Sequence, residues 1–313
     1  MGDRVVITGA AGFIGSALAA RHVAEGAVVH ALVRHGAGIE RLPKGVAIHP
    51  VDLGNHDALR GVLAETAPTI IYHLATSTGR ATAPSAQSGV EAAGSDVANL
   101  LGLLSVAAAL PHPPRSFVRT GTLAEYGDGP TPAREEQREH PKNGYTGAMV
   151  AGTHLVSALQ SRLPFHARTA RLGLTYGPRQ SSTFLIPLLI ERCLAAEPSL
   201  VRTPEQRRDL IFVDDVVSGL IALARSDRPD AGVVNLATGE APTMREAAWL
   251  VARCCGADPG LIRFGDEMPA DVPPVVCGDP SRARNILGWQ ATCSLEEGLR
   301  RTIHALRYER AAA

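Results

Sequence analysis

The feature that most limits the possible folds lies near the N-terminus, where an apolar run at residues 5–8 leads directly into a segment with glycines at positions 9, 12 and 15. Glycines at this spacing allow a tight turn between a strand and a helix, and the turn brings backbone N–H groups close to a pyrophosphate. An ordinary strand–turn–helix is the alternative. We predict a dinucleotide site whose contacts are Gly9, Gly12, Phe13, Ile14 and Gly15.

The first half of the chain alternates short β-branched runs with helical patterns. This alternation is typical of a parallel sheet with crossover helices. The fold class is therefore α/β, with a doubly wound parallel sheet of the Rossmann type. The predicted strands are residues 4–8, 28–33, 46–52, 70–74, 116–120 and 167–172, and helices are expected to begin near residues 12, 55, 89 and 145.

After residue 176 the pattern changes to helices separated by Pro- and Gly-rich loops, with only short strands. A chain of 313 residues is long for a single core, so we expect a second, smaller α/β domain that binds substrate. The expected division is a dinucleotide-binding domain at 1–175 and a mainly substrate-binding domain at 176–313.

Charge and hydropathy limit the possible partners. The 31 basic and 31 acidic residues cancel, which leaves no basic field for a nucleic acid. No run of about 20 apolar residues suggests a membrane span, and the chain begins directly with a strand, so a cytoplasmic protein without a membrane partner is expected. The five cysteines lack zinc-site spacing, and no metal is expected.

The end of the second predicted strand bears on the choice of cofactor. An acid there binds the ribose 2′-hydroxyl of NAD, whereas an arginine can pair with the 2′-phosphate of NADP. Val33 stands at the usually acidic position and Arg34 follows it. The sequence therefore favours NADP(H) over NAD(H), with Arg34 as a contact; a solvated surface arginine is the alternative.

Four later segments, taken in order, carry a resemblance to a known family. They are residues 119–127 (RTGTLAEYG), 145–149 (YTGAM), 176–178 (YGP) and 206–217 (QRRDLIFVDDVV). Together with the glycine turn they resemble the extended short-chain dehydrogenase/reductase superfamily, in its sugar nucleotide-modifying branch. The resemblance covers nearly the whole chain. It implies a nucleoside diphosphate sugar as substrate, a return of residues 211–239 to the first domain, and a homodimer paired through the alanine- and leucine-rich helices.

The resemblance also implies further cofactor contacts. Asp52-Leu53 matches a pair that contacts the adenine ring, and residues 73–75 match a His-Leu-Ala segment that passes beside the phosphates and ribose. His73 ends a buried strand and is expected to be structural. The implied contacts are Asp52, Leu53, Leu74, Ala75, Thr76, Thr120 and Tyr145.

The reacting centre departs from the family pattern at one position. By resemblance, Tyr145 transfers the proton and Thr122 polarises the sugar oxygen, but Met149 stands where the family has a lysine. A nearby cation lowers the pKa of an acid by about 1 to 3 units, so without the lysine Tyr145 should stay protonated. Only Lys44 and Lys142 are lysines, and Lys142 lies in the loop before the helix, where it is not expected to substitute.

A neutral phenol is the acid that a ketoreductase needs, whereas epimerases and dehydratases begin by oxidising an alcohol and need tyrosinate. Leu123 and Ala124 replace the Asp-Glu pair of the 4,6-dehydratases, and the segment looks like that of several 4-keto-6-deoxy sugar nucleotide reductases. We therefore predict an NADPH-dependent 4-ketoreductase. Two alternatives stay open: a sugar nucleotide 4-epimerase with tightly bound NAD, and a cofactor-binding protein without turnover in which Met149 is a core residue.

Four residues are candidate substrate contacts. Arg208 matches an arginine that holds the diphosphate in relatives, a task suited to its planar guanidinium. Glu125 is a possible substrate ligand, with helix capping or an arginine pair as its alternative. Arg179 and Gln180 follow the Tyr-Gly-Pro segment and are expected in the same cleft or in a solvated loop. Leu174 and Met268 replace an asparagine and an arginine usual in the family.

Overall fold

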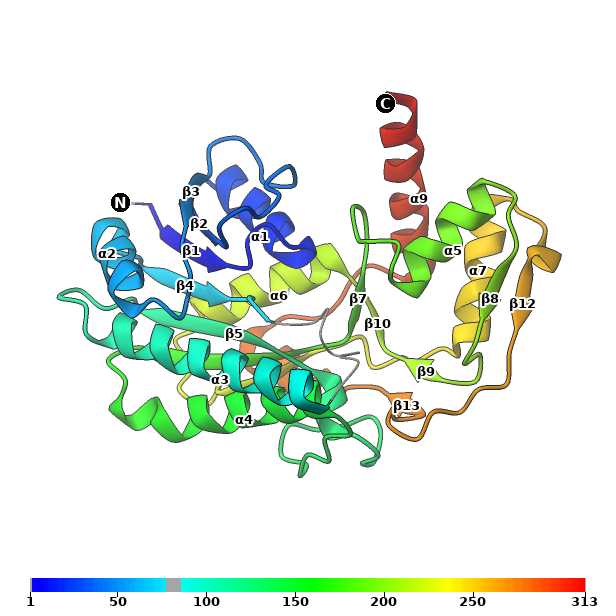
Figure 1. The fold of residues 1–313 in the computed structure, drawn as a ribbon. Coiled ribbons are helices and arrows are strands. Elements are labelled where there is room, and N and C mark those ends of the chain that lie inside the picture. Colours follow the sequence, from blue (N-terminus) through cyan, green and yellow to red (C-terminus); the bar gives the residue numbers. More distant parts are fainter. Residues whose placement is uncertain (1, 77–85, 313) are drawn as a thin grey trace.

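The computed structural model describes residues 2–76 and 86–312, and its centre is a seven-stranded parallel sheet (Figure 1). The strand order is β11-β6-β5-β4-β1-β2-β3. Six strands were predicted, and β11 is an additional edge strand that pairs with β6. The strands are β1 (Arg4–Thr8), β2 (Val28–Val33), β3 (Ala47–Pro50), β4 (Ile70–His73), β5 (Ser116–Thr122), β6 (His166–Leu172) and β11 (Val233–Leu236).

Helices cover both faces of this sheet, so the predicted doubly wound fold is confirmed. α1 packs against α6 on one face, and α2, α3 and α4 pack together on the other. The short helix η2 (Leu123–Tyr126) follows β5 and packs against α4. The helices are α1 (Phe13–Ala24), α2 (His56–Thr66), α3 (Ala86–Ala108), α4 (Gly144–Leu159), with η3 (Gln160–Arg162) directly after it, and α6 (Val213–Arg225).

One described helix, α3, is long and apolar enough to cross a membrane by length and composition, over Gln87–Ala108 with a mean hydropathy of 1.2. The sequence argument overlooked it because its many alanines and glycines are each only weakly apolar. In the structure Leu100, Leu103 and Leu104 are buried in a core cluster with Phe117 of β5. Packing of this kind is ordinary for a core helix on a parallel sheet.

The second half of the chain adds a smaller part built from two-stranded parallel pairs and helices (Figure 1). The pairs are β7 (Leu174–Tyr176) with β10 (Leu210–Phe212), β8 (Ser199–Val201) with β12 (Ile262–Phe264), and β9 (Arg207–Arg208) with β13 (Val275–Val276). The helices are α5 (Leu185–Leu194), α7 (Met244–Cys255), η4 (Pro259–Leu261), α8 (Ser281–Leu287) and α9 (Leu295–Ala312).

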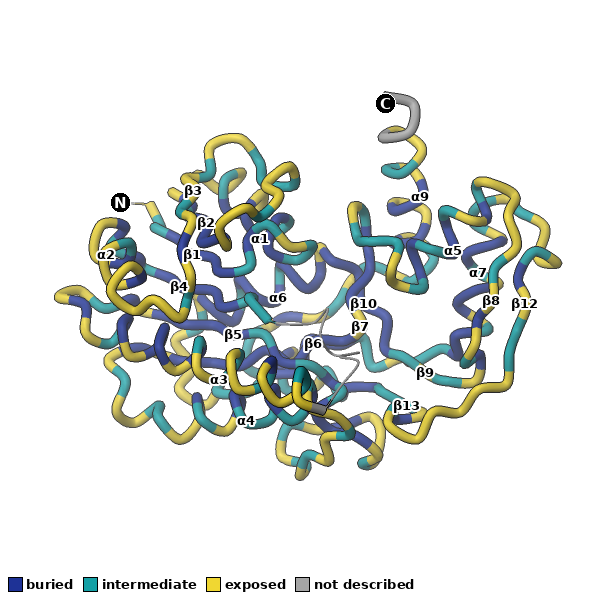
Figure 2. The backbone as a smooth tube through the Cα atoms, in the orientation of Figure 1, coloured by how far each residue is buried: buried dark blue, intermediate teal, exposed yellow. Residues whose placement is uncertain are grey.

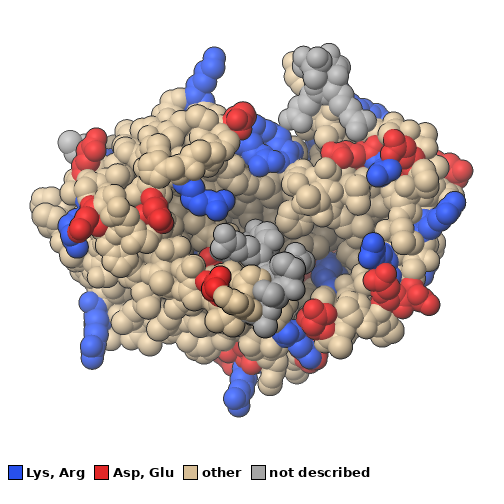
Figure 3. Space-filling model, viewed as in Figure 1, with Lys and Arg blue, Asp and Glu red and all other residues tan. Residues whose placement is uncertain are grey.

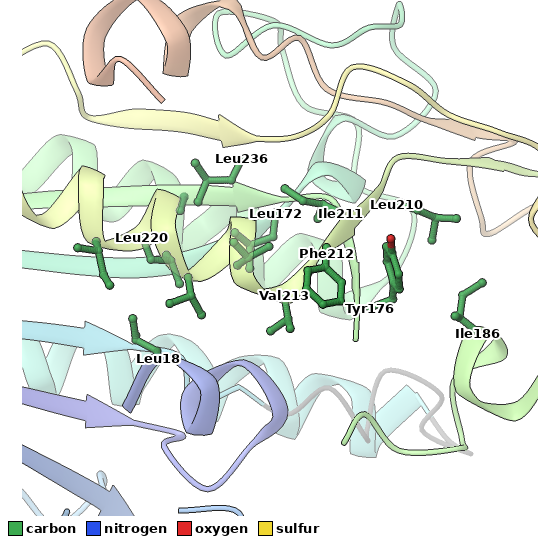
Figure 4. Packing of buried hydrophobic residues seen from close by; sticks show 14 of the residues in the cluster. Leu18, Leu172, Tyr176, Ile186, Leu210, Ile211, Phe212, Val213, Leu220 and Leu236 are labelled. Atoms are coloured by element: carbon green, nitrogen blue, oxygen red, sulfur yellow. The ribbon is translucent and has the colours of Figure 1, made fainter. Parts of the chain in front are cut away.

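A single apolar cluster joins the two parts. It runs from Leu18 of α1 through Leu220 of α6 to Ile186 of α5, and buried backbone follows it from one part into the other (Figures 2 and 4). The rings of Tyr176 and Phe212 meet edge to face in it, with centroids 5.7 Å apart. Because this core crosses residue 175, the division into domains at 1–175 and 176–313 stays a prediction.

Candidate functional site

The glycine turn has the shape of an anion cradle. Gly9 has φ +71, and a Cβ added there would lie 2.8 Å from the backbone N of Ala75, so only glycine fits. At Gly15 an added Cβ would lie 2.2 Å from the Gly9 carbonyl oxygen. α1 begins after Gly12 with no side-chain cap and no acidic residue in its first turn, so its N–H groups are left for an anionic group. The residues present fit a dinucleotide.

His73 and Thr8 hold the end of β4 against this turn. The His73 Nδ1 lies 2.8 Å from the Thr8 hydroxyl, which also accepts a hydrogen bond from the Ala75 N–H at 3.2 Å. Burial lowers the pKa of His73 to about 3, so the ring is neutral. His73 is thus structural in this arrangement, and its contacts hold Leu74 and Ala75 beside Gly9.

The predicted contacts at the far end of the dinucleotide lie at the same edge of the sheet. Arg34 is exposed and directly follows the buried Val33, which ends β2. Asp52 is also exposed, and its carboxylate accepts a hydrogen bond from the Gly54 N–H at 3.0 Å, while Leu53 is half-buried. β2 and β3 are paired with Val33 opposite Pro50, so the residues that follow both strands emerge together.

Thr122 ends β5 and caps η2. Its hydroxyl oxygen accepts a hydrogen bond from the Ala124 N–H at 3.2 Å, so the hydroxyl proton is left to be donated elsewhere. Tyr145 is the second residue of α4, which begins with an Asn143 capping box. Since η2 packs against α4, Thr122 and Tyr145 stand on adjoining elements at the carboxyl edge of the sheet.

The environment of Tyr145 favours the neutral phenol. Burial, and after it the carboxylate of Glu125, raises the pKa of Tyr145 to about 12, with Asp96 acting in the same direction. The guanidinium of Arg119 opposes them. Lys142 does not supply a cation here, because its ammonium pairs with Asp128 in the loop before α4.

Met149 lies one turn after Tyr145 on α4 and is 5% exposed. Arg119 of β5 lies against it, with Nη1 3.3 Å from the Met149 carbonyl oxygen and Nη2 3.5 Å from its sulfur. Sequence reasoning missed Arg119. The available signal was an arginine inside an otherwise apolar strand, a position where a charge is seldom buried without a role.

A small cavity opens beside these residues, between α3, α4 and the ends of β4 and β5. Asp96 of α3 accepts a hydrogen bond there from the Thr76 hydroxyl at 3.1 Å. The predicted contacts Thr76 and Thr120 both face this cavity, which places them close to Met149. Its lining includes Thr76, Asp96, Arg119, Thr120, Met149 and Gly152.

The prediction that Glu125 binds substrate is wrong for this structure. Glu125 is fully buried, completes the capping box of η2, and pairs with Arg171 of β6 at 2.8 Å. It also accepts a hydrogen bond from Thr153 of α4 at 2.9 Å. The capping and arginine-pair alternative is therefore the one observed, because a carboxylate in the interior needs such partners.

Arg208 suits an anionic ligand. It is half-buried on β9, and its guanidinium donates to the carbonyls of Arg207 at 2.7 Å and Pro274 at 3.3 Å and to the Gln206 side chain at 2.6 Å. Burial lowers the pKa of Arg208 to about 10. Among the described residues it has no ion pair, so a diphosphate would compensate its charge.

Arg179 and Gln180 lie in the loop after β7, and their contact with substrate stays a prediction. Arg179 donates to the carbonyls of Glu40 and Arg41 at 3.0 and 3.1 Å, in the segment after β2. Gln180 donates to the Thr175 carbonyl at 2.9 Å, and its own side-chain oxygen is buried without a hydrogen-bond partner. Basic side chains lie along the hollow between the two parts of the molecule (Figure 3).

Comparison with known proteins identifies the family of this chain. The NAD dependent epimerase/dehydratase family matches residues 5–237. This chain belongs to that family. It is 30% identical to the UDP-glucose 4-epimerase of Mycolicibacterium smegmatis over 97% of this chain and 98% of that protein. It is 28% identical to UDP-glucuronic acid decarboxylase 1 of Xenopus tropicalis, over 98% of this chain and 72% of that protein.

A solved structure of the same epimerase/dehydratase family has the same fold. The Thermus thermophilus UDP-glucose 4-epimerase, in complex with NAD, superimposes with a TM-score of 0.85 and 27% identity, over 97% of this chain and 98% of that one. The expected short-chain dehydrogenase/reductase fold and sugar nucleotide branch are thereby confirmed. The preference for NADP and the ketoreductase activity find no support in these relatives, which favour the epimerase alternative.

Proposed function

We propose that this protein is an NAD-dependent epimerase of a nucleoside diphosphate sugar, acting at the sugar C4. The observation that carries the proposal is the placement of Thr122 and Tyr145 on adjoining elements at the carboxyl edge of the sheet. Relatives that match along almost the whole chain and are named UDP-glucose 4-epimerases support it.

The chain's own residues would act on the proton. Thr122 would donate a hydrogen bond to the sugar oxygen, and Tyr145 in its ionised form would take up the proton released as the alcohol becomes a ketone. Bound NAD would supply the two-electron acceptor that is restored in the same turnover. After the ketone rotates in the site, the sugar carbon would regain the hydride on its other face and Tyr145 would return the proton, so no net oxidation or reduction occurs.

Arg208 would hold the diphosphate end of the substrate. A half-buried guanidinium that is paired only with carbonyl and amide oxygens gains a charge-assisted contact when a phosphate arrives. Leu123 and Ala124 have no ionisable groups, so they offer no acid–base pair for elimination of water. The proposal therefore favours epimerisation over dehydration.

A second candidate is the 4-ketoreductase. It is favoured by the high pKa of Tyr145, about 12, because a phenol that stays neutral is a proton donor and not a base. The reaction would consume one reduced nicotinamide cofactor per turnover, which separates it from epimerisation.

The test is a cofactor balance. The purified protein is denatured to identify any nucleotide it carries, and the native protein is incubated with UDP- and dTDP-linked hexoses without added cofactor. We expect bound NAD and formation of the 4-epimer, and Tyr145→Phe as control should abolish it. The ketoreductase would instead be identified by stoichiometric oxidation of NADPH with a 4-keto sugar nucleotide, together with no formation of epimer when NADPH is absent.

We also propose a homodimer paired through α3 and α4. α3 leaves Val90 and Leu101 exposed, at 73% and 36%. Burying such residues on an identical helix pair is a common route to a two-fold dimer. Light scattering at micromolar concentration should give twice the chain mass of 32.9 kDa; a monomer at that concentration would contradict this.

A further inference from the structure

Among the described residues, Arg119 is the cation that lies against Met149, the position at which the family has a lysine. Its guanidinium reaches from β5 along α4, with Nη1 2.9 Å from the Thr153 hydroxyl and Nη2 3.5 Å from the Met149 sulfur. Tyr145, Met149 and Thr153 are spaced four residues apart, so their side chains share one face of α4. The guanidinium therefore occupies the same helix face as the Tyr145 ring.

Gly152 makes room for this arrangement. A Cβ added at Gly152 would lie 2.9 Å from both Cζ and Nη2 of Arg119, closer than packed carbon atoms approach. Leu100 of α3 would lie 3.1 Å from the same added atom, so the helix could not move away easily. Glycine at this position and arginine at 119 therefore fit each other as a pair.

The charge of Arg119 is not neutralised by direct contact. Its hydrogen-bond partners are a carbonyl, a hydroxyl and a thioether, and among the described residues no carboxylate lies within ion-pair distance of it. The Thr153 hydroxyl in turn donates a hydrogen bond to the Glu125 carboxylate at 2.9 Å. A buried cation that has only neutral direct contacts acts more strongly on other groups nearby.

We infer that the buried guanidinium of Arg119 takes over the task of the absent lysine, supplying the positive charge that lets Tyr145 exchange its proton with substrate. Arg119 is thus a positioning residue that acts through Tyr145. The inference rests on the proposed function only in requiring Tyr145 to transfer a proton, and it holds for the epimerase and the ketoreductase alike.

Within the described part of the chain, the charged groups that act on Tyr145 come from three elements. Glu125 of η2 and Asp96 of α3 raise the pKa of Tyr145, and Arg119 of β5 lowers it. Loss of the Arg119 charge leaves the two carboxylates unopposed, so the pKa of Tyr145 must rise further. At any fixed pH a smaller fraction of Tyr145 is then ionised, by about tenfold for each unit.

The first test moves the charge from strand to helix. Arg119→Met should lower kcat for epimerisation by about 10- to 100-fold and displace the pH–rate profile to higher pH. Adding Met149→Lys, in the space that the guanidinium vacates, should recover most of the loss. In a Tyr145→Phe background, Arg119→Met should have little further effect, because the two residues act as one unit.

Arg168→Met is the matched control. Arg168 is an equally buried arginine, on β6, whose guanidinium donates to the carbonyls of Leu223, Ser226 and Arg228. Its loss should lower stability without displacing the pH–rate profile, and Met149→Lys should not rescue it. Absence of rescue in the Arg119→Met protein, or an equal displacement in Arg168→Met, would overturn the inference.

A titration separates this inference from the proposed function. Carbon NMR of ring-labelled tyrosine, assigned with Tyr145→Phe, follows the ionisation of Tyr145 without any sugar nucleotide. Its onset should move to higher pH in Arg119→Met by about one unit. If Arg119→Met does not fold, Gly152→Ala displaces the guanidinium and should move the onset in the same direction. An unchanged onset defeats the inference, whereas a moved onset without epimerase activity defeats only the proposed function.

Discussion

Two buried arginines on neighbouring strands have opposite surroundings. Arg171 of β6 pairs with Glu125 at 2.8 Å and also with Glu139, and it lies 4.5 Å above the Tyr126 ring. Arg119 of β5, 2% exposed, has only neutral hydrogen-bond partners among the described residues. Burial opposes the charge of both residues, but the carboxylates raise the pKa of Arg171, whereas the pKa of Arg119 is lowered.

This difference implies that the charge of Arg171 stabilises the fold, whereas the charge of Arg119 affects nearby ionisable groups. A cation paired with carboxylates exerts a small net field on its surroundings, and removing it leaves those carboxylates buried and unpaired. A cation with neutral partners exerts its field on whatever ionisable group lies nearby. We therefore expect loss of Arg171 to cost mainly stability and loss of Arg119 to cost mainly proton transfer.

The largest effect is expected when the group on which Arg119 acts is removed. Tyr145→Phe should lower turnover by about 10² to 10⁴, the usual contribution of a positioned proton-transfer group. Unfolding by urea should change little, because only the hydroxyl is removed. Steady-state kinetics measures the fall in turnover, and cofactor binding shows that the rest of the site is intact. If turnover is unchanged, another group transfers the proton, and the functional role that we assign to Arg119 is contradicted.

The next effect concerns the paired arginine. Arg171→Met should lower the free energy of unfolding by about 3 to 5 kcal/mol, because Glu125 is left buried without its partner. Urea denaturation measures the loss, and adding Glu125→Gln should restore part of it. A stable Arg171→Met protein with a displaced pH–rate profile would reverse the roles that we assign to Arg171 and Arg119.

A smaller effect is expected at a third arginine, which is half-buried and faces the proposed substrate. Arg208→Ala should raise the KM for a nucleoside diphosphate sugar by about 10- to 100-fold, which corresponds to one charge-assisted contact. The kcat should change less, since Arg208 would hold the diphosphate and not the reacting sugar carbon. Kinetics with UDP as a competing ligand check the assignment: unchanged inhibition by UDP would place the diphosphate elsewhere.

The sequence predicts features that depend on neighbouring residues better than contacts between residues far apart in the chain. Local patterns were sufficient for the glycine turn and six strands, because period and turn chemistry are properties of neighbouring residues. They did not predict that Glu125 pairs with Arg171, 46 positions away, or that Arg119 lies against Met149. Such contacts depend on how β5, β6 and α4 pack, and a single sequence does not show which buried charges then meet.

The smallest effect is expected at an arginine that is exposed. Arg34 directly follows β2, and on that ground the sequence favours NADP, whereas the Thermus relative is in complex with NAD. An exposed arginine without a phosphate partner contributes little, so Arg34→Ala should change the affinity for NAD by less than about 0.5 kcal/mol. Calorimetric titration of wild type and Arg34→Ala with NAD and NADP provides the measurement. If wild type binds NADP more tightly than NAD and Arg34→Ala removes that preference, the prediction of NADP is confirmed. Arg34 would then determine the choice of cofactor although it is exposed.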